Sequence, residues 1–349
     1  MARKMELQCP MPKFDFDVIT LGHGSGGLLT NKLLESGVFD LLSNEALDAH
    51  HDGAVLDLDG PVAFSTDSFV ISPIFFPGGD IGELAVNGTI NDVAMCGARP
   101  RFISLSFILE EGLPIEDFWK ILVSIRQACE NAGVKVVTGD TKVVEKGKGD
   151  QIFINTTGLG TIHPQARIHH RRIRPGDKII VSNQIAAHGV AILSVRQGLT
   201  FNTTIESDTA ALHEPILDLL DRWGPAVKLL RDPTRGGLAA TLNELARDTG
   251  LGYILQETAL PIAAQVRAAC EMLGLDPLYI ANEGIFLAVA APEHAEAMTE
   301  RLRQHPLCRH AAVIGEVAEQ PAGGVLITQP LGGKRPVSMP IGEQLPRIC

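Results

Sequence analysis

Residues 61–109 read PVAFSTDSFVISPIFFPGGDIGELAVNGTINDVAMCGARPRFISLSFIL, and this stretch decides the fold of the first half of the chain. Its two ends are rich in β-branched and aromatic residues, which is typical of strands at 61–71 and 101–109. Between them, apolar residues recur at the spacing of one helix face, at Ile81, Leu84, Ala85, Val93 and Ala94. A strand, a helix and a second strand in this order predict a domain of mixed α/β class.

The same alternation extends to both sides of this stretch. Strands are predicted upstream at 18–21 and 54–58, and a helix at 115–132 precedes strands at 134–139 and 151–160. Residues 162–177 are basic, contain proline and lack apolar periodicity, so we expect a domain boundary there. A second α/β pattern follows, with strands predicted at 178–182, 252–256, 284–290 and 311–317 and helices near 188–198, 211–222, 237–248, 262–273 and 293–304.

The composition is that of an ordinary folded protein. Its 349 residues include 30 Lys and Arg against 41 Asp and Glu, a formal net charge of −11. An acidic protein repels a phosphate backbone, so we expect no nucleic-acid partner. No apolar run reaches the roughly 18 residues of a membrane span, and the N-terminus lacks a targeting pattern, so we expect a cytoplasmic protein with no membrane partner. The 6 cysteines form no CxxC pair, and one of them, Cys349, is the last residue.

The glycine-rich segment GHGSGG at 22–27 has the spacing G-x-G-x-x-G, which brings backbone N–H groups to phosphates in dinucleotide-binding proteins. No strand with an acidic residue follows about 20 positions on, and Gly27 leads to Leu28 rather than to the Lys of a Walker A loop. The segment is therefore either a tight turn or a flexible loop that folds over a nucleotide. His23 within it is either a phosphate donor or a loop residue.

Four aspartates occupy similar positions at strand ends or helix starts, at Asp67, Asp92, Asp140 and Asp232. Each of them alone is typical of a helix cap or a turn. Together, with Lys142 and Arg235 nearby, they can form a metal-bridged triphosphate site, because Mg²⁺ prefers carboxylate oxygens and phosphates. Glu283, in the segment LYIANEGIF, is either a general base or a turn residue.

The last twenty residues, PLGGKRPVSMPIGEQLPRIC, contain four prolines and three glycines. This composition favours an extended, mobile arm. The arm ends in the thiol of Cys349, a soft nucleophile that can carry a covalently attached group between sites. The alternative is an unordered terminus that tolerates any residue.

Eight segments together carry a family signature: HGSGG at 23–27, AFSTDSFVISPIFFPGG at 63–79, NDVAMCGARP at 91–100, FILEEGLP at 107–114, VTGDTKVV at 137–144, DPTRGGL at 232–238, LYIANEG at 278–284 and PRIC at 346–349. On these motifs the chain resembles the hydrogenase-maturation carbamoyl dehydratases of the PurM-like ATPase superfamily, to which aminoimidazole ribonucleotide synthetase also belongs. The internal motifs are shared in part with selenophosphate synthetase and thiamine monophosphate kinase. The terminal Pro-Arg-Ile-Cys is what singles out the carbamoyl dehydratases.

The resemblance implies a two-domain PurM-like fold with a flexible tail. We expect an N-terminal extension at 1–17, an N-terminal mixed-sheet domain at 18–161, a C-terminal α/β domain at 162–335 and a mobile tail at 336–349. It also implies a homodimer, in which the N-terminal domains of two copies meet in a β-barrel-like interface with ATP sites near it.

The resemblance further implies roles for individual residues. Mg²⁺ ligands are expected at Asp67, Asp92, Asp140 and Asp232. ATP is expected to contact Gly24, Gly26, Gly27, Asp67, Asn91, Asp92, Thr138, Gly139, Asp140, Arg235 and Gly236, with 22–27 as a mobile lid. The expected catalytic residues are Cys349, Glu283, Lys142 and His23, with Glu283 preferred as the base.

The chemistry implied by the resemblance begins with a HypF-like carbamoyltransferase, which would leave a thiocarboxamide on Cys349. ATP would then phosphorylate the amide oxygen, and a base would remove a nitrogen proton as phosphate leaves. The cyanide, held as a protein thiocyanate, would pass to the iron of a NiFe hydrogenase on a HypC–HypD-like complex. A tail that swings inward for dehydration and outward for delivery explains a Pro- and Gly-rich arm.

Two other functions remain open from the residues alone. The first is a PurM-like ATP-dependent small-molecule kinase or synthetase, in which Cys349 is incidental. The second is a metal carrier that uses the histidine pairs at 50–51 and 169–170 and the terminal thiol. The aspartate set argues against a carrier of soft metals, which would use Cys and His rather than scattered carboxylates.

Overall fold

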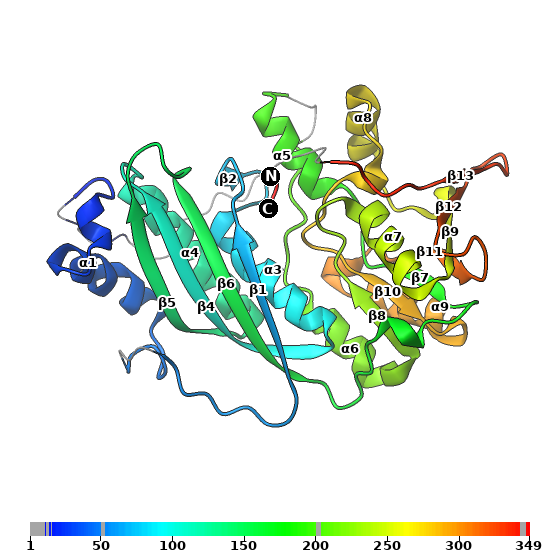
Figure 1. The fold of residues 1–349 in the computed structure, drawn as a ribbon, viewed down its shortest axis with the longest axis horizontal. Coiled ribbons are helices and arrows are strands. Elements are labelled where there is room, and N and C mark those ends of the chain that lie inside the picture. The colour runs from blue at the N-terminus through cyan, green and yellow to red at the C-terminus, as the bar shows by residue number, and fades with distance from the viewer. Residues whose placement is uncertain (1–10, 12–13, 15, 50–52, 200–203, 343–346) are drawn as a thin grey trace.

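The computed structural model describes residues 11, 14, 16–49, 53–199, 204–342 and 347–349. The chain forms two layered domains side by side, and the C-terminus lies between them (Figure 1). A four-stranded sheet organises the first domain and a seven-stranded sheet the second. The predicted α/β class is therefore confirmed, and the proposed barrel-like interface between two copies stays a prediction. Among the described residues, no helix is both long and apolar enough to cross a membrane.

The N-terminal sheet has the strand order β1-β6-β4-β5, with β4 and β5 parallel and the other neighbours antiparallel. Its strands are β1 (Val62–Phe69), β4 (Ala98–Glu110), β5 (Lys135–Val144) and β6 (Ile152–Ile162). A short hairpin of β2 (Phe75–Phe76) and β3 (Gly79–Asp80) leads into the first long helix. The smaller helices α1 (Leu28–Leu33) and α2 (Asp40–Leu42) flank a π-helical turn at Leu34–Phe39.

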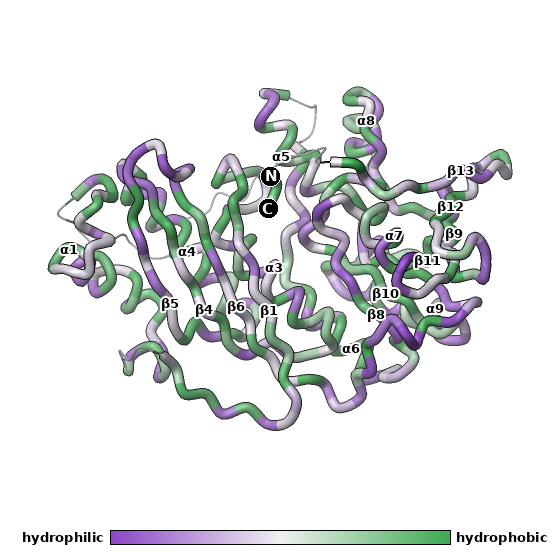
Figure 2. The backbone as a smooth tube through the Cα atoms, viewed as in Figure 1, coloured by the Kyte–Doolittle hydropathy of each residue, from purple (hydrophilic) through white to green (hydrophobic). Residues whose placement is uncertain are grey.

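Helices α3 (Ile81–Met95) and α4 (Ile115–Ala132) pack on the same face of this sheet. Asp80 caps α3, because its Oδ1 accepts hydrogen bonds from the amides of Gly82 and Glu83 at 2.7 and 3.1 Å. No helix of the described residues covers the opposite face of the sheet, and the side chain of Phe64 on it is 66% exposed. The alternation of apolar and polar residues along the strands is visible in Figure 2.

The C-terminal sheet has the order β13-β12-β9-β11-β7-β10-β8. Its strands are β7 (Lys178–Val181), β8 (Val227–Arg231), β9 (Gly252–Gln256), β10 (Leu287–Ala290), β11 (Ala312–Ala318), β12 (Val325–Thr328) and β13 (Lys334–Pro336). Helices α5 (Ala187–Arg196), α7 (Gly237–Thr249) and α8 (Ala264–Leu273) contribute to the core on one face. Helices α6 (His213–Trp223) and α9 (Pro292–Arg303) cover the other face. The central strands are buried on both faces, which explains their continuous apolar runs.

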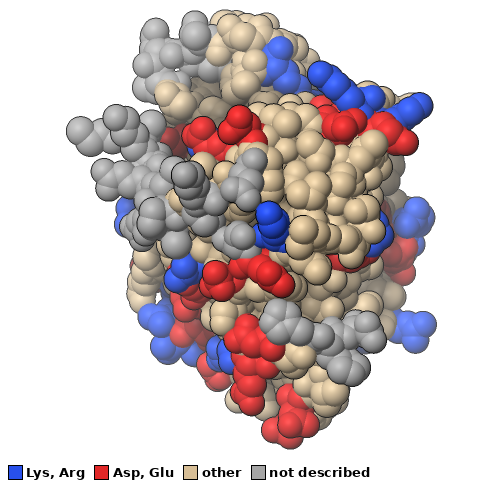
Figure 3. All heavy atoms as spheres, turned by 90° about the vertical axis from the view of Figure 1, so that its left-hand side faces the viewer, with Lys and Arg blue, Asp and Glu red and all other residues tan. Residues whose placement is uncertain are grey.

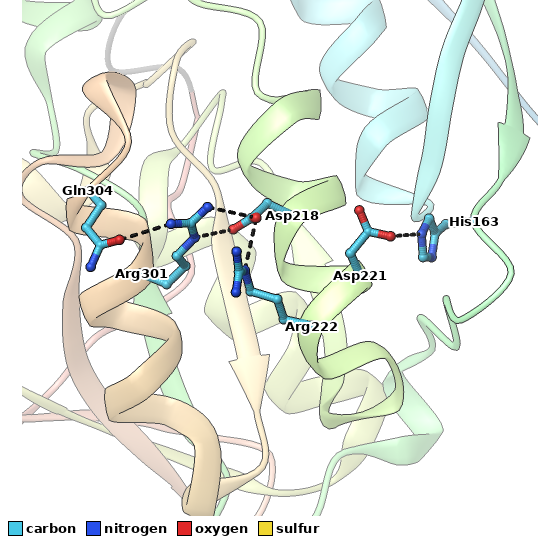
Figure 4. Close-up of polar contacts among 6 residues, drawn as sticks. All are labelled: His163, Asp218, Asp221, Arg222, Arg301 and Gln304. Atoms are coloured by element: carbon cyan, nitrogen blue, oxygen red, sulfur yellow. Dashed lines mark hydrogen bonds and ion pairs between the residues drawn. The ribbon is translucent and has the colours of Figure 1, made fainter.

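Helix α6 is tied to its surroundings by ion pairs on its polar side (Figure 4). Asp218 accepts two bonds from the guanidinium of Arg301 on α9, from Nε at 2.7 Å and from Nη2 at 3.0 Å. Asp221 lies 2.9 Å from the Nε2 atom of His163, just after β6. Because His163 follows the last strand of the N-terminal sheet, this contact joins the two domains at α6.

Two strand predictions are wrong. Val18 forms only an isolated bridge with Pro114, and residues 21–24 form a short 3-10 helix. Residues 54–58 pair with no strand in the described part of the chain, and Val55 is 98% exposed. A strand needs a neighbour along its length to satisfy its N–H and C=O groups. Val18 and Ile19 pair only briefly with residues 112–114, and residues 54–58 find no strand partner in the described part of the chain.

Candidate active site

Three of the predicted aspartates lie close together where the two domains meet. Asp67 is on β1, Asp92 is on α3 and Asp232 follows β8. Burial, and then repulsion from Asp92, raises the pKa of Asp67 to about 6. Burial and the same neighbour raise the pKa of Asp232 to about 6. The Ser65 hydroxyl donates to Asp92 Oδ2 at 2.6 Å. The fold therefore brings these carboxylates close enough to oppose one another's ionisation.

Glu283 lies beside these aspartates. Its side chain is 5% exposed, and its Oε1 has no hydrogen-bond partner among the described residues. Burial, followed by repulsion from Asp208 and Asp232, raises its pKa well above the ordinary range of a glutamate. Such a carboxyl holds its proton near neutral pH and becomes a strong base once it is ionised.

The segment 282–284 is held rigidly around Glu283. Asn282 donates to Pro233 O at 2.8 Å and accepts from the Ala186 amide at 2.7 Å. The Glu283 amide donates to Asp208 Oδ1 at 3.1 Å. A Cβ on Gly284 would lie 1.5 Å from Asp208 O, so only glycine fits at this position. The NEG motif therefore combines an anchor, a candidate base and a close backbone approach.

Arg235 and Gly236 lie beside these carboxylates, and Arg235 brings a positive charge to them. The Arg235 charge lowers the pKa values of Asp67, Glu283 and Cys349, against the larger effect of burial. Gly236 has φ of +75° and precedes α7, whose N-cap lacks a side-chain hydrogen bond. An uncapped helix N-terminus next to an arginine suits a phosphate.

The last three residues of the chain are docked next to these groups through backbone hydrogen bonds. The Val70 amide donates to Cys349 O at 3.2 Å, and the Ser72 amide donates to Arg347 O at 3.4 Å. Arg347 Nε donates to Val70 O at 3.1 Å, and its guanidinium also pairs with Asp150. The tail therefore runs alongside residues 70–72, which follow β1.

Side chains of the C-terminal domain hold the same segment from the other side. His188, at the start of α5, is fully buried, and its Nε2 lies 2.7 Å from Ile348 O. Its Nδ1 lies 2.8 Å from the Ser207 hydroxyl. Arg196 donates from Nε to Ser72 O at 2.5 Å and from its other end to Arg347 O. The Ile348 side chain is 2% exposed and belongs to a core cluster with residues of both domains.

This docking leaves Cys349 half-buried among charged groups. Burial raises its pKa to about 12, and repulsion from Glu283, Asp67 and Asp232 acts in the same direction. The thiol is therefore protonated in this position and is a poor nucleophile there. Among the predicted residues, Cys349, Glu283, Asp67, Asp92, Asp232, Arg235, Gly236 and Asn91 form one group, which we call the acidic site.

The remaining predicted residues form a second group on β5 and the glycine loop. Gly24, Gly26, Thr138, Gly139, Asp140 and Lys142 line a cavity of about 380 Å³, here called the β5 pocket. A Cβ on Gly24 would lie 2.5 Å from Val143 N, so glycine lets the loop rest on β5. Asp140 and Lys142 form an ion pair at 2.5 Å that is largely exposed. The Lys142 contact lowers the pKa of Asp140.

His23 and Gly27 border the β5 pocket without lining it. His23 is 1% exposed, and its Nδ1 accepts from the Thr20 amide at 2.9 Å. Its ring centroid is 4.2 Å from that of Phe16, and burial lowers its pKa. Gly27 is the exposed N-cap of α1.

The two groups stay apart within one subunit. Across the sheet, Ser68 pairs with Asn155, Asn155 with Ser106, and Ser106 with Asp140. Asp140 is therefore three strand spacings, or about 14 Å, from Ser68, the residue next to Asp67. Asp140 therefore does not join the other three aspartates in a single chain.

The donor chemistry of the acidic site fits Mg²⁺. The described residues hold no ready-made cluster of three or more metal ligands of the His, Cys, Asp and Glu types. Mg²⁺ is commonly held by one or two carboxylates together with substrate phosphates and waters, so such a cluster is not required. The raised pKa values of Asp67 and Asp232 are those of carboxylates that a cation would relieve. Of the histidine pairs, 50–51 lies outside the described residues, and the rings of 169–170 contact each other at a tilt of 42° on the linker.

Two family models match the chain. The AIR synthase related protein N-terminal domain covers residues 50–162, and its C-terminal domain covers residues 174–328. The fold and the site therefore define a protein of the AIR synthase-related class.

Similar proteins narrow this class. The carbamoyl dehydratase HypE of Azotobacter vinelandii is 52% identical to the chain, over 95% of this chain and 97% of the relative. A solved hydrogenase maturation protein HypE in complex with ATP has a TM-score of 0.91 and 47% identity, over 94% of this chain and 99% of that one. A HypE–HypF complex has a TM-score of 0.78 and 43% identity, over 90% and 100%. The chain belongs to the carbamoyl dehydratase HypE family.

Sequence reasoning missed Asp208, His188 and Arg196. Asp208 is half-buried beside Glu283, and burial raises its pKa to about 6. His188 and Arg196 read as ordinary residues of a core helix, and only their contacts with the tail distinguish them. A single sequence offers no signal for such contacts, because the partners are more than a hundred residues apart.

Proposed function

We propose that this protein is an ATP-dependent carbamoyl dehydratase of hydrogenase maturation, whose substrate is its own C-terminal cysteine carrying a carbamoyl group. The observation that carries the proposal is the docked tail. The Cys349 thiol lies near a candidate base, Glu283, and a candidate phosphate ligand, Arg235. A terminus without function has no reason to seat its last side chain in an acidic site.

The reaction we propose converts R–S–C(=O)–NH₂ and ATP into R–S–C≡N, ADP and inorganic phosphate. The amide oxygen attacks the terminal phosphoryl group of ATP, ADP leaves, and the nitrogen gives up one proton. The second N–H proton is then removed as the C–O bond breaks and phosphate departs with that oxygen. The product is a thiocyanate on Cys349, which supplies cyanide to the hydrogenase iron.

We assign the proton transfers to Glu283. Its raised pKa makes it a stronger base than an ordinary glutamate, and it borders the thiol in the docked tail. Lys142 and His23 belong to or border the β5 pocket on the far side of the sheet. Arg235 and the N-terminus of α7 are proposed to bind the transferred phosphate. Asp67, Asp92 and Asp232 would hold Mg²⁺, which neutralises charge on the phosphoryl group when bound.

A homodimer is part of the proposal, because one subunit separates Asp140 and Lys142 from the acidic site. The uncovered face of the N-terminal sheet carries exposed apolar residues such as Phe64 and Ile108. Residues 54–58 are extended and find no strand partner in the described part of their own chain. Pairing two such sheets would cover both features, and we propose that the β5 pocket of one subunit then completes the acidic site of the other.

We propose that the docked and released positions of the tail serve different steps of the reaction cycle. A thiol with a pKa of about 12 reacts poorly, so carbamoyl loading by a HypF-like carbamoyltransferase requires the released tail. Dehydration requires the docked tail. Delivery to a HypC–HypD-like iron complex again requires release, all in the cytoplasm. The complex of a related HypE with HypF supports the first of these partners.

Mass spectrometry of the C-terminal peptide tests the proposal. Incubation with the carbamoyltransferase and carbamoyl phosphate should add about 43 Da at Cys349, and Mg-ATP should then remove about 18 Da. Cys349→Ser should abolish both changes, whereas Cys270→Ser, which alters a cysteine in the core of the C-terminal domain, should leave them intact. ATP turnover that persists in Cys349→Ser on an added small amide would instead identify a small-molecule kinase.

A further inference from the structure

A second cavity, of about 480 Å³, lies where the N-terminal sheet meets α6. Its walls come from the start of β4, the start of β5, the end of α4 and the first turn of α6. Along β4 it is several residues from the position opposite Asp140, and the acidic-site residues do not line it. We call it the α6 pocket.

Three basic side chains line the α6 pocket. Arg99 and Arg101 come from β4, and Lys135 opens β5 directly opposite Phe102 of β4. None of the three has a hydrogen bond or an ion pair within the described ranges of the chain. The lining carboxylates do not neutralise them, since Glu130 pairs with Arg126 at 2.7 Å and Glu214 lies 3.8 Å from His305. In a protein of net charge −11, this is a local concentration of uncompensated positive charge.

A buried histidine points to a ligand independently of these cations. His213 lines the α6 pocket with only 6% of its surface exposed. Its Nδ1 is fully buried and has no hydrogen-bond partner among the described residues. Burial lowers the pKa of His213, the nearby Glu214 carboxylate opposes this shift, and the Arg99 charge acts in the same direction as burial. Buried polar atoms normally have hydrogen-bond partners. An unpartnered imidazole next to three unpaired cations therefore indicates a binding site for a polar ligand.

The first turn of α6 adds backbone donors to the pocket. His213 is the first residue of this eleven-residue helix, and its N-cap Leu212 provides no side-chain cap. The N-terminal N–H groups of a helix favour negative charge. Paired guanidinium groups recognise phosphate oxygens bidentately.

We propose that the α6 pocket binds a small phosphorylated anion. The volume is within the range of small-molecule sites, which favours a compact ligand over the surface of a macromolecule. The donors come from both domains, so the ligand would bridge the N-terminal sheet and α6.

A chain of hydrogen bonds connects the α6 pocket to the acidic site. The Leu212 amide donates to Asn91 Oδ1 at 2.8 Å. Asn91 Nδ2 donates in turn to Ala210 O at 2.9 Å and to Glu283 O at 3.3 Å. A ligand that shifts the first turn of α6 therefore acts on the backbone of the proposed base.

The test is titration of the full-length protein with inorganic pyrophosphate, followed by NMR of ¹³C-labelled histidine rings. The His213 signal is assigned by its loss in His213→Gln. We expect this signal to move in a saturable way and the apparent affinity to fall about tenfold in Arg101→Gln. Arg309→Gln removes an exposed arginine outside the pocket and should leave the affinity unchanged. Arg235→Gln should weaken binding at the acidic site while the His213 response persists.

A His213 signal that does not respond to millimolar pyrophosphate overturns the proposal. So does a response with the same midpoint in Arg101→Gln and Arg309→Gln, because general screening would then explain it. A response that disappears in Arg235→Gln would also overturn it, since the acidic site would then be the only one. Lys135→Gln is a second pocket variant, and because its side chain is exposed the fold should tolerate it. These outcomes are independent of carbamoyl chemistry.

Discussion

One apolar side chain contributes to the docked position of the last three residues, and this contribution can be measured. Ile348 is 2% exposed and packs with Ile192 and Ala281. Ile348→Ala removes three carbons from this contact, at about 0.8 kcal/mol for each buried carbon, or about 2.4 kcal/mol. Residues 347–349 are at the end of the chain and can leave their position without unfolding either sheet, so the loss falls on docking rather than on global folding. The docking equilibrium should shift by about 50-fold.

The assay is the rate at which iodoacetamide alkylates Cys349, read on the C-terminal peptide by mass spectrometry. A docked thiol is buried and protonated, so labelling proceeds through the released tail and its rate follows the released fraction. We expect Cys349 labelling to rise up to about 50-fold in Ile348→Ala and about fourfold in Ile348→Val. The exposed Cys96 provides an internal reference in each sample.

Ile341→Ala is the matched control, because this tail residue is fully exposed and should leave the labelling rate unchanged. Equal labelling of Cys349 in wild type and Ile348→Ala would refute the packing argument. Equal increases in Ile348→Ala and Ile341→Ala would refute it as well, since the tail would then respond to composition rather than to its pocket.

Three further outcomes are expected. His188→Gln should raise Cys349 labelling by about tenfold while leaving carbamoyl loading intact, because the Ile348 carbonyl loses its buried partner at Nε2; unchanged labelling would count against this anchor. Asp140→Ala and Glu283→Gln homodimers should each dehydrate the loaded tail at least a hundredfold more slowly, and mixed dimers should recover activity if the two groups meet between subunits; mixing without recovery contradicts that arrangement. Asp232→Asn should stabilise the ligand-free protein above pH 6, by up to about 3 kcal/mol, in thermal unfolding. The direction of this stability change follows from the raised pKa of Asp232, about 6. The neutral form of Asp232 is the one that stabilises the fold; it is complete below the pKa of the unfolded chain, near 4, and is lost as the pH rises through about 6. The gain should therefore vanish near pH 4, and a gain that is constant with pH would contradict this cause.

Local patterns in the chain predicted most of the elements and nearly all of the cleft residues. The strand and helix around Asp67 and Asp92 follow from alternation and helical spacing, which depend only on neighbouring residues. The exceptions have a common reason. Residues 18–21 and 54–58 alternate like strands, but pairing needs a partner that no local pattern contains. Asp208 sits in a plain SDTAAL segment and becomes important only because Gly284 lets its backbone approach so closely.

The residue types alone therefore indicated the chemistry that we propose for this protein: carboxylates for a cation, an arginine and glycines for phosphate, and a terminal thiol as carrier. They did not specify the arrangement of these groups. The fold separates Asp140 from Asp67 by three strand spacings and places Cys349 beside Glu283. Side-chain chemistry is a property of each residue, whereas these distances arise from strand order and from contacts between segments as far apart as Val70 and Cys349. Such contacts are set by the packing of the whole chain, which a short motif does not encode.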